Sequence, residues 1–145
     1  MIHENTYKSV DFLGAKGLVF LGDKIVTYRR DDKTRSHPLC IDLPGGGREG
    51  SESPFDTFKR EVKEEFGIVI NKEDIIFSGV HQSYIDPRRE SYFIVAKPLN
   101  LKATDVILGN EGTEWLLMSP EEFINRPDGI RIQQERVRAY LSRML

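Results

Sequence analysis

The sequence predicts a mixed α/β domain in which helices cover a mixed β-sheet. Short segments rich in valine, leucine, isoleucine and aromatic residues alternate along the chain with three segments that carry helix-start signals or apolar residues at helical spacing. The length of 145 residues suits one hydrophobic core, so we expect a single domain over residues 1–145. No internal repeat, low-complexity tract or long linker divides the sequence.

The predicted strands are short, and most of them come in pairs. Residues 15–30 form two apolar runs around the letters LGD, which suit a tight turn, so this segment is predicted to be a hairpin. Residues 74–85 and 90–99 flank the turn sequence DPRR and make a second pair. Two further strands are expected at residues 38–44 and 114–118.

The best-marked helix is predicted to run from Ser53 to Gly67. Ser53 is a favourable N-cap, Pro54 suits the first turn, and Asp56 stands at the third helical position. Gly67 suits the left-handed conformation that often ends a helix.

Two other helices are expected near the C-terminus. The first begins at Ser119, with Pro120 in its first turn and Glu122 placed to complete a capping box. The second covers residues 130–145, where Val137, Leu141 and Leu145 recur at helical spacing.

The helix after Ser53 carries acidic residues on one face. At about 100° per residue, the three glutamates Glu61, Glu64 and Glu65 occupy an arc of about 100°, next to an apolar arc of about 80°. Like charges at these spacings repel, and the macrodipole disfavours carboxylates in the C-terminal half of a helix. The cluster is therefore either a solvated surface face or a site for a divalent cation, which needs several oxygen ligands.

A glycine-rich segment, LPGGGREGSE, precedes this helix. Glycines let the backbone approach a ligand closely, and a backbone carbonyl there is available to a metal ion. The segment lacks the G-K-[ST] of a P-loop. Together with the acidic face, it favours the cation site.

The glycines and glutamates together resemble the Nudix box, G-x5-E-x7-R-E-U-x-E-E-x-G-U, in which U is aliphatic. The match spans 23 residues and includes every fixed position: Gly46, Glu52, Arg60, Glu61, Val62, Glu64, Glu65, Gly67 and Ile68. The preceding hairpin and the downstream EGTEWLLMSPEEF also resemble the family's layout. One departure is CIDL, at a place where the family often has a tryptophan before Pro-Gly-Gly.

The resemblance implies an α/β/α sandwich with a mixed, curved sheet. It also implies a MutT-like hydrolase that cleaves a diphosphate linkage in a nucleoside diphosphate joined to another group, using Mg²⁺ or Mn²⁺. The expected metal ligands are Glu61, Glu64 and Glu65, with the carbonyl of Gly45 as a further ligand.

The resemblance assigns roles to other residues of the site as well. Arg60 is expected to pair with Glu52 and so to orient the acidic cluster. The general base is either a glutamate of the box or an acid from a later loop, for which Glu111 is the first candidate and Glu114 the second. The alternative for both later residues is a solvated loop carboxylate.

Substrate choice depends on weaker signals. Arg29 and Arg30 end the first hairpin, near where family members hold substrate phosphate, although an arginine at a strand end is often simply exposed. In the family, a tyrosine about 16 residues beyond the box accompanies dinucleoside polyphosphate substrates, and a proline there accompanies ADP-ribose. Tyr84 lies 16 residues after Ile68, and Pro87 lies 19 after it. This favours a nucleoside triphosphate or a dinucleoside polyphosphate.

Composition limits the partners and the compartment. A net charge of −2 gives no basic surface for long nucleic acid, and no apolar run reaches the length of a membrane span. The lone Cys40 has no internal disulfide partner, which fits the cytoplasm. The expected partner is a small nucleotide, and a homodimer is left open.

Two other functions compete with the hydrolase. Cys40 suggests the related isopentenyl diphosphate isomerases, which use a cysteine, but its surroundings indicate a buried apolar position in a strand. A non-catalytic nucleotide-sensing module is the second, although such a module is expected to lose carboxylates of the box and this chain keeps them all.

Overall fold

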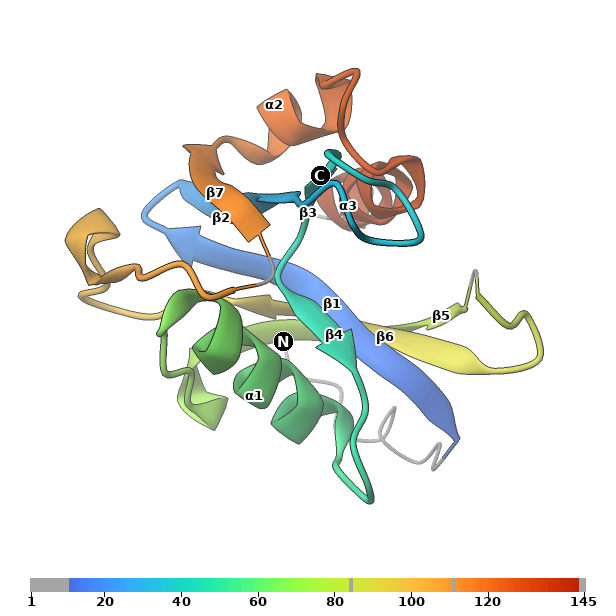
Figure 1. Ribbon diagram of the computed structural model, residues 1–145. Coiled ribbons are helices and arrows are strands. Elements are labelled where there is room, and N and C mark those ends of the chain that lie inside the picture. Colours follow the sequence, from blue (N-terminus) through green and yellow to red (C-terminus); the bar gives the residue numbers. More distant parts are fainter. Residues whose placement is uncertain (1–10, 84, 111, 144–145) are drawn as a thin grey trace.

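A mixed seven-stranded sheet lies between helices in the computed structural model, which describes residues 11–83, 85–110 and 112–143 (Figure 1). The strands are β1 (Phe12–Leu21), β2 (Lys24–Arg30), β3 (Ile41–Asp42), β4 (Gly45–Gly47), β5 (Ile75–Gln82), β6 (Glu90–Ala96) and β7 (Gly112–Met118). The helices are α1 (Pro54–Phe66), α2 (Pro120–Asn125) and α3 (Arg131–Arg143), with 3₁₀ turns η2 (Lys72–Asp74) and η3 (Ala103–Asp105). The predicted α/β fold class is confirmed.

Strand β1 organises the sheet because it pairs along most of its length. It runs parallel to β6 and antiparallel to β4, and its last residues pair with β2. Strand β2 continues the sheet to β3 and β7, and β5 pairs with the far side of β6. The sheet is therefore mixed, with β1 shared by its two parts.

Successive residues of β1 face opposite cores, as the pleat of a strand requires. Val19 packs into the core that contains Phe58 and Val62 of α1. Its neighbour Leu18 packs into the core that contains Val137 and other residues of α3. Helix α1 thus covers one face of the sheet, and α2 and α3 cover the other (Figure 1).

The helix ends follow the predicted caps. Ser53 Oγ accepts a hydrogen bond from the Asp56 backbone N–H at 3.1 Å, and Gly67 ends α1 with φ 67°. Ser119 Oγ accepts from the Glu122 N–H at 3.0 Å at the start of α2. Helix α3 ends at Arg143 in the described residues, so the predicted contribution of Leu145 lies outside them.

The predicted strands differ from the structure mainly in extent. Both strand pairs form, and β7 begins two residues earlier than expected, at Gly112. The strand predicted over residues 38–44 shrinks to Ile41–Asp42, which leaves Cys40 before the strand and half-buried instead of fully buried. The glycines 45–47, interpreted as a loop, form β4. None of the described helices has the length and apolar content needed to cross a membrane.

Candidate active site

Strand β4 lies between β1 and the acidic face of α1, and at Gly45 only glycine permits the approach to β1. Gly45 has φ 125°, and an added Cβ there would overlap the carbonyl oxygen of Ala15 on β1. An added Cβ at Gly46 would overlap the carboxylate of Glu61 on α1. The glycine segment therefore lies flush against both the sheet and the acidic face of the helix.

Arg60 connects that segment to α1 through its guanidinium. Nε and Nη2 donate to the two carboxylate oxygens of Glu52 at 2.7 and 3.1 Å, and Nη2 also donates to the Gly47 carbonyl at 2.8 Å. Nη1 donates to Glu61 at 2.7 Å and approaches Glu64 at 3.3 Å. Hydrogen bonds from Arg60, opposed by burial, hold the pKa of Glu52 below its usual range.

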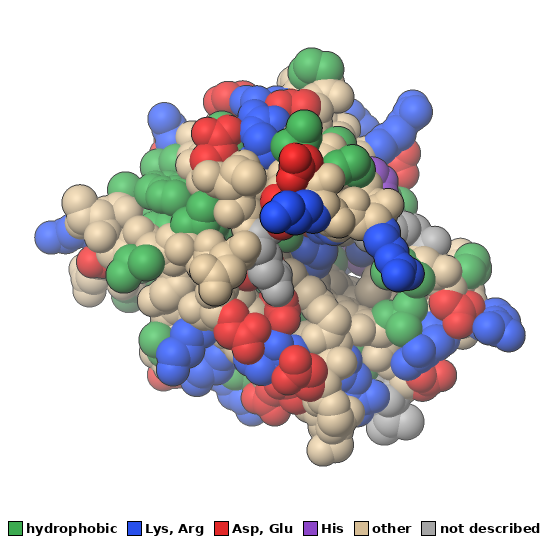
Figure 2. Space-filling model, viewed as in Figure 1, with side chains coloured by type: hydrophobic (Ala, Val, Ile, Leu, Met, Phe, Trp, Pro, Cys, Tyr) green, Lys and Arg blue, Asp and Glu red, His purple; other side chains and the backbone are tan. Residues whose placement is uncertain are grey.

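The three glutamates of α1 occupy different environments. Glu61 and Glu65 are buried, with 9% and 4% of their surface exposed, whereas the Glu64 side chain is 56% exposed. Figure 2 shows acidic side chains with basic ones among them on the surface over α1. Within residues 11–83, 85–110 and 112–143, no three His, Cys, Asp or Glu side chains come together in a group that could hold a metal ion. The expected convergence of all three glutamates is thus absent from this arrangement.

Glu65 nevertheless presents a free carboxylate oxygen. Its Oε1 accepts the Gly45 N–H at 3.0 Å, while Oε2 is buried and has no hydrogen-bond partner in the part of the chain that the structure describes. Burial raises the pKa of Glu65 to about 8, against the opposing effects of Lys16 and the Gly45 N–H. A buried, unpartnered carboxylate oxygen beside backbone carbonyls fits a hard divalent cation.

An ion pair between the partly buried Lys16 and the buried Asp42 lies behind β4, and sequence reasoning missed it. Lys16 Nζ donates to Asp42 Oδ2 at 2.9 Å and to the carbonyls of Leu43 and Gly45 at 3.1 and 3.2 Å. Burial opposes the charge of Lys16, but Asp42, together with Tyr28 and Glu65, raises its pKa, so the side chain is a cation. The available signal was a single charge inside each of the apolar runs GAKGLVF and CIDLP.

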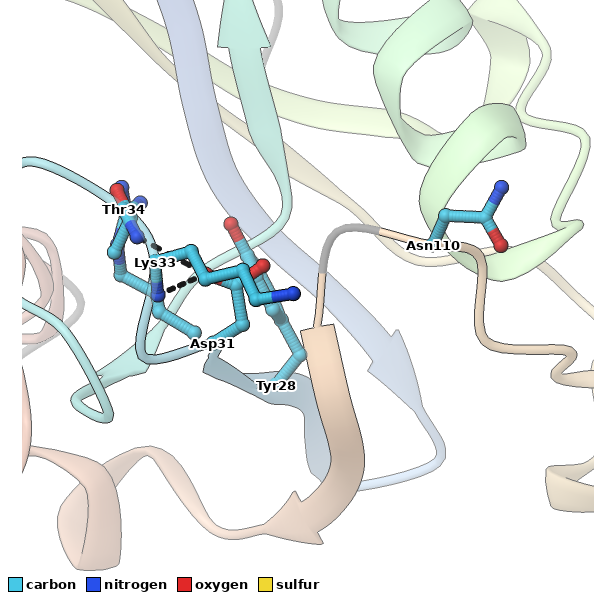
Figure 3. Close-up of a pocket in the computed structure, with 6 residues that line it drawn as sticks. Tyr28, Asp31, Lys33, Thr34 and Asn110 are labelled. Atoms are coloured by element: carbon cyan, nitrogen blue, oxygen red, sulfur yellow. Dashed lines mark hydrogen bonds between the residues drawn. The ribbon is translucent and has the colours of Figure 1, made fainter.

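A polar cleft of about 320 Å³ lies beside this ion pair (Figure 3). The cleft is lined by Tyr28, Arg30, Asp31, Lys33, Thr34 and Asn110. Arg30 Nη1 donates to Asp42 Oδ2 at 2.9 Å, and Arg30 Nη2 donates to Thr34 at 2.6 Å. Figure 3 shows Asn110 on the segment that leads into β7, apart from the other labelled residues.

The cleft and the acidic face of α1 are neighbours. The N–H of Gly109, which precedes Asn110, donates to the main-chain carbonyl of Glu65 at 2.7 Å. On the other side, Asp42 accepts from both Arg30 of the cleft and Lys16 behind Gly45. Arg30 at the end of β2 is therefore connected to Glu65 of α1 through Asp42, Lys16 and Gly45.

Of the described residues expected to contact substrate, the structure places one, Arg30, in the cleft. Arg30 lines the cleft, but Arg29 donates to Glu114 at 2.7 Å and to Asp128 at 3.2 Å. Glu114, the second candidate for the base, is thus ion-paired with Arg29 on the neighbouring strand. Tyr84 and Glu111 lie outside the described residues.

Comparisons with known proteins identify the type of domain. A family model described as NUDIX domain matches residues 13–141. The MutT protein from Methanosarcina mazei Go1 has a similar structure, with a TM-score of 0.67 at 24% identity over 90% of this chain and 95% of that chain. No curated protein sequence matches the chain.

Two more solved structures share the fold at lower identity. A C. elegans Ap4A hydrolase binary complex has a TM-score of 0.68 at 19% identity, covering 90% of this chain and 97% of that chain. A bifunctional NMN adenylyltransferase/ADP ribose pyrophosphatase from Francisella tularensis, complexed with AMP and a Mn ion, has a TM-score of 0.69 at 17% identity. That match covers 92% of this chain and 42% of the longer one.

Proposed function

The chain belongs to the NUDIX domain family, and on that premise we propose that it is a divalent-metal-dependent hydrolase of nucleoside diphosphate derivatives. The reaction is cleavage of a diphosphate linkage, with a nucleoside triphosphate or a dinucleoside polyphosphate as the preferred substrate class. The observation that carries the proposal is the buried, unpartnered Oε2 of Glu65 beside the glycine strand, next to a cleft that contains cationic side chains.

The proposed cation is Mg²⁺ or Mn²⁺. Its ligands are drawn from Glu61, Glu64 and Glu65, with the Gly45 carbonyl as a further oxygen. Two of these glutamates are buried one helical turn apart, and the Gly45 peptide contacts Glu65, which supports the set. When bound, such an ion neutralises phosphate oxygens and lowers the pKa of a water.

Arg60 and Glu52 are proposed to orient the carboxylates. The bidentate contact between them fixes the guanidinium plane, which leaves Nη1 directed at Glu61 and Glu64. Arg60 also holds the Gly47 carbonyl, so the same side chain sets the distance between the glycine strand and the helix. Glu111 remains our candidate for the general base that takes a proton from the attacking water.

Arg30 is the proposed phosphate ligand at the end of β2. It lines the cleft with Lys33, so two cationic side chains face the space beside the acidic helix. Both arginines have carboxylate partners, Arg29 in Glu114 and Asp128 and Arg30 in Asp42. The proposal rests on Arg30 because it is the one of the two that lines the cleft. Tyr84 is kept as a substrate contact on the strength of its spacing from the box.

The polar lining favours the polyphosphate part of a substrate. Tyr28 is the only aromatic residue among the described residues that line the cleft, so this part of the site lacks a pair of rings to enclose a base. A chain of phosphates suits Arg30, Lys33 and Thr34 better. The net charge of −2 gives no basic surface for long nucleic acid, so small nucleotides are the proposed partners. The lone Cys40 fits a cytoplasmic enzyme, which is also part of the proposal. A homodimer is left open.

A substrate screen tests the proposed function. Nucleoside triphosphates, dinucleoside polyphosphates, nucleotide sugars and ADP-ribose are each incubated with the protein and Mg²⁺ or Mn²⁺. The nucleotide and the second phosphate-containing product of each cleavage are then separated and measured by anion-exchange chromatography. We expect turnover of a polyphosphate substrate that EDTA abolishes and that Glu65→Gln reduces by at least about 10²-fold. Absence of metal-dependent cleavage across all four classes would contradict the proposal, and rearrangement of an isoprenoid diphosphate would favour the isomerase.

A further inference from the structure

Lys16 places a largely buried ammonium group, on a side chain that is 17% exposed, next to the candidate metal site. It lies on β1 opposite Gly45, and its Nζ donates to the Gly45 carbonyl at 3.2 Å. The N–H of the same Gly45 donates to Glu65. One residue, Gly45, therefore contacts both the lysine cation, through its carbonyl, and the glutamate whose second oxygen has no hydrogen-bond partner among the described residues.

Lys16 forms its ion pair with Asp42 and not with Glu65. Among the described carboxylates, Asp42 alone forms an ion pair with Lys16, at 2.9 Å, and its side chain is 1% exposed. The same oxygen of Asp42 accepts from Arg30 at 2.9 Å and from the Tyr28 hydroxyl at 3.4 Å. Arg30 and Tyr28 thus fix the Asp42 carboxylate on the side of the cleft, and the same carboxylate binds Lys16 on the side of β4.

We propose that Asp42 is a positioning residue that keeps the Lys16 ammonium away from Glu65 and thereby leaves the unpartnered Glu65 oxygen to a divalent cation. The inference rests on the proposed function, since it concerns the same metal site. Buried charges remain paired, because an isolated charge in the interior is costly. Without the charge of Asp42, the carboxylate that remains to attract the Lys16 cation is Glu65, which contacts Gly45 as Lys16 does.

This arrangement makes an unusual prediction about charge. Removing an acid near a metal site normally weakens metal binding, and removing a nearby base normally strengthens it. If Asp42 acts by restraining Lys16, the two changes are not independent. Loss of Asp42 should harm the site mainly while Lys16 is present to compete for Glu65.

A double-mutant cycle measured on Mn²⁺ binding tests the proposal. The affinity of the protein for Mn²⁺ alone is determined without substrate, by the electron paramagnetic resonance signal of the free ion. We expect Asp42→Asn to weaken Mn²⁺ binding by about tenfold or more, in the range found when groups behind metal ligands are replaced. The double variant Asp42→Asn/Lys16→Met should return to within about threefold of the parent.

Matched controls remove the same charges elsewhere. Asp128→Asn removes a carboxylate held by two arginines, and Lys24→Met removes an exposed lysine at the start of β2. Both should bind Mn²⁺ as the parent does. Thermal unfolding of every variant is recorded, and if Asp42→Asn does not fold, Asp42→Ser takes its place in the cycle, with the same loss of Mn²⁺ affinity and the same recovery on adding Lys16→Met as the expected result.

The possible outcomes separate this inference from the proposed function. If the parent itself binds no Mn²⁺, the proposed function fails. If the parent binds it and Asp42→Asn binds equally well, Asp42 has no part in the site. A loss in Asp42→Asn that the second substitution does not restore assigns Asp42 a purely structural role and overturns the proposal, as does weaker binding by Lys16→Met alone.

Discussion

A single planar side chain, Arg60, determines how the glycine strand and the acidic helix face each other. Its two donors to Glu52 and its donor to Gly47 lie on one side, and Nη1 reaches Glu61 at 2.7 Å. A lysine has the charge but not the planar fork, so it cannot reproduce these parallel contacts.

We therefore expect Arg60→Lys to lower turnover by about tenfold or more while the protein remains folded. The measurement is the steady-state rate with the best substrate from the screen, alongside the unfolding temperature. Arg131→Lys, at an arginine whose side chain is 92% exposed, serves as the matched control and should leave both values unchanged. Turnover within twofold of the parent would mean that Arg60 is only a surface residue.

Glu64 is the exposed member of the three glutamates. Its replacement tests whether the protein is an enzyme or a binding module. Glu64→Gln keeps the size of the side chain and removes one of the proposed anionic ligands. We expect turnover to fall by at least about 10²-fold, roughly 2.7 kcal/mol of transition-state stabilisation, with substrate affinity changed far less. Steady-state rates and equilibrium binding measure the two effects.

Glu121→Gln, on the exposed surface of α2, is the control for a charge change of the same kind. If Glu64→Gln turned over as fast as the parent, Glu64 would have to be removed from the proposed ligand set. A parent that binds the nucleotide with no turnover at all would support the non-catalytic module.

Among the elements, α1 carries the candidate metal ligands, and its stability depends on the capping residues at its two ends. The Ser53 side chain accepts the N–H of Asp56, which would otherwise lack a partner in the first turn. We expect Ser53→Ala to lower the free energy of unfolding by about 1 kcal/mol, within the range of about 0.5–2 kcal/mol for lost N-caps. Urea denaturation provides the measurement.

Ser142→Ala is the comparison within a helix. Ser142 is exposed near the end of α3 and its hydroxyl donates to the Arg138 carbonyl, a contact that contributes little to helix stability. Its replacement should change the free energy of unfolding by less than about 0.5 kcal/mol. Equal effects of the two substitutions would count against a specific capping role for Ser53.

The elements that could be predicted from the sequence are those with local signals. The caps of α1 and the turn between β5 and β6 depend on residues adjacent in sequence, and both formed as expected. Strand β4 could not be predicted, because glycine has a low intrinsic tendency to form strands and its extended conformation comes from pairing with β1. The parallel pairing of β1 with β6 likewise depends on contacts distant in sequence.

At the scale of the whole molecule, the candidate site residues also divide into those with a local sequence signal and those whose contacts are distant in sequence. Glu52, Arg60 and the glutamates lie within one short segment, so their spacing revealed them. Lys16 and Asp42 lie 26 residues apart, and neither has a local pattern that points to the other. The pairing that engages Arg29 was also hidden, since Asp128 lies 99 residues along the chain.

Asp128 ties the C-terminal helices to the sheet. Its carboxylate accepts from Arg126 at 2.8 and 3.0 Å and from Arg29 of β2 at 3.2 Å, and its carbonyl accepts from the Ile41 N–H. Hydrogen bonds from Arg126, opposed by burial and assisted by Arg29, lower the pKa of Asp128 to about 2 from the ordinary 3.8. Because the unfolded chain binds the proton more readily, this pairing stabilises the fold above the unfolded pKa and is lost as the pH falls through the folded one.

We therefore expect Asp128→Asn to be less stable than the parent at pH 7 by about 1 kcal/mol, a modest value because the side chain is partly exposed and the pair is screened. The gap should stay constant down to about pH 5 and then narrow between about pH 4 and pH 2, where the parent loses the contribution and the variant has none to lose. Urea denaturation of both proteins across this range gives the difference directly. Asp32→Asn, at an exposed acid, corrects for the general effect of removing a carboxylate. A gap that persisted unchanged at pH 2.5 would show that Asp128 acts through packing or its neutral hydrogen bonds, and its charge would then have no part in holding the C-terminal helices to β2.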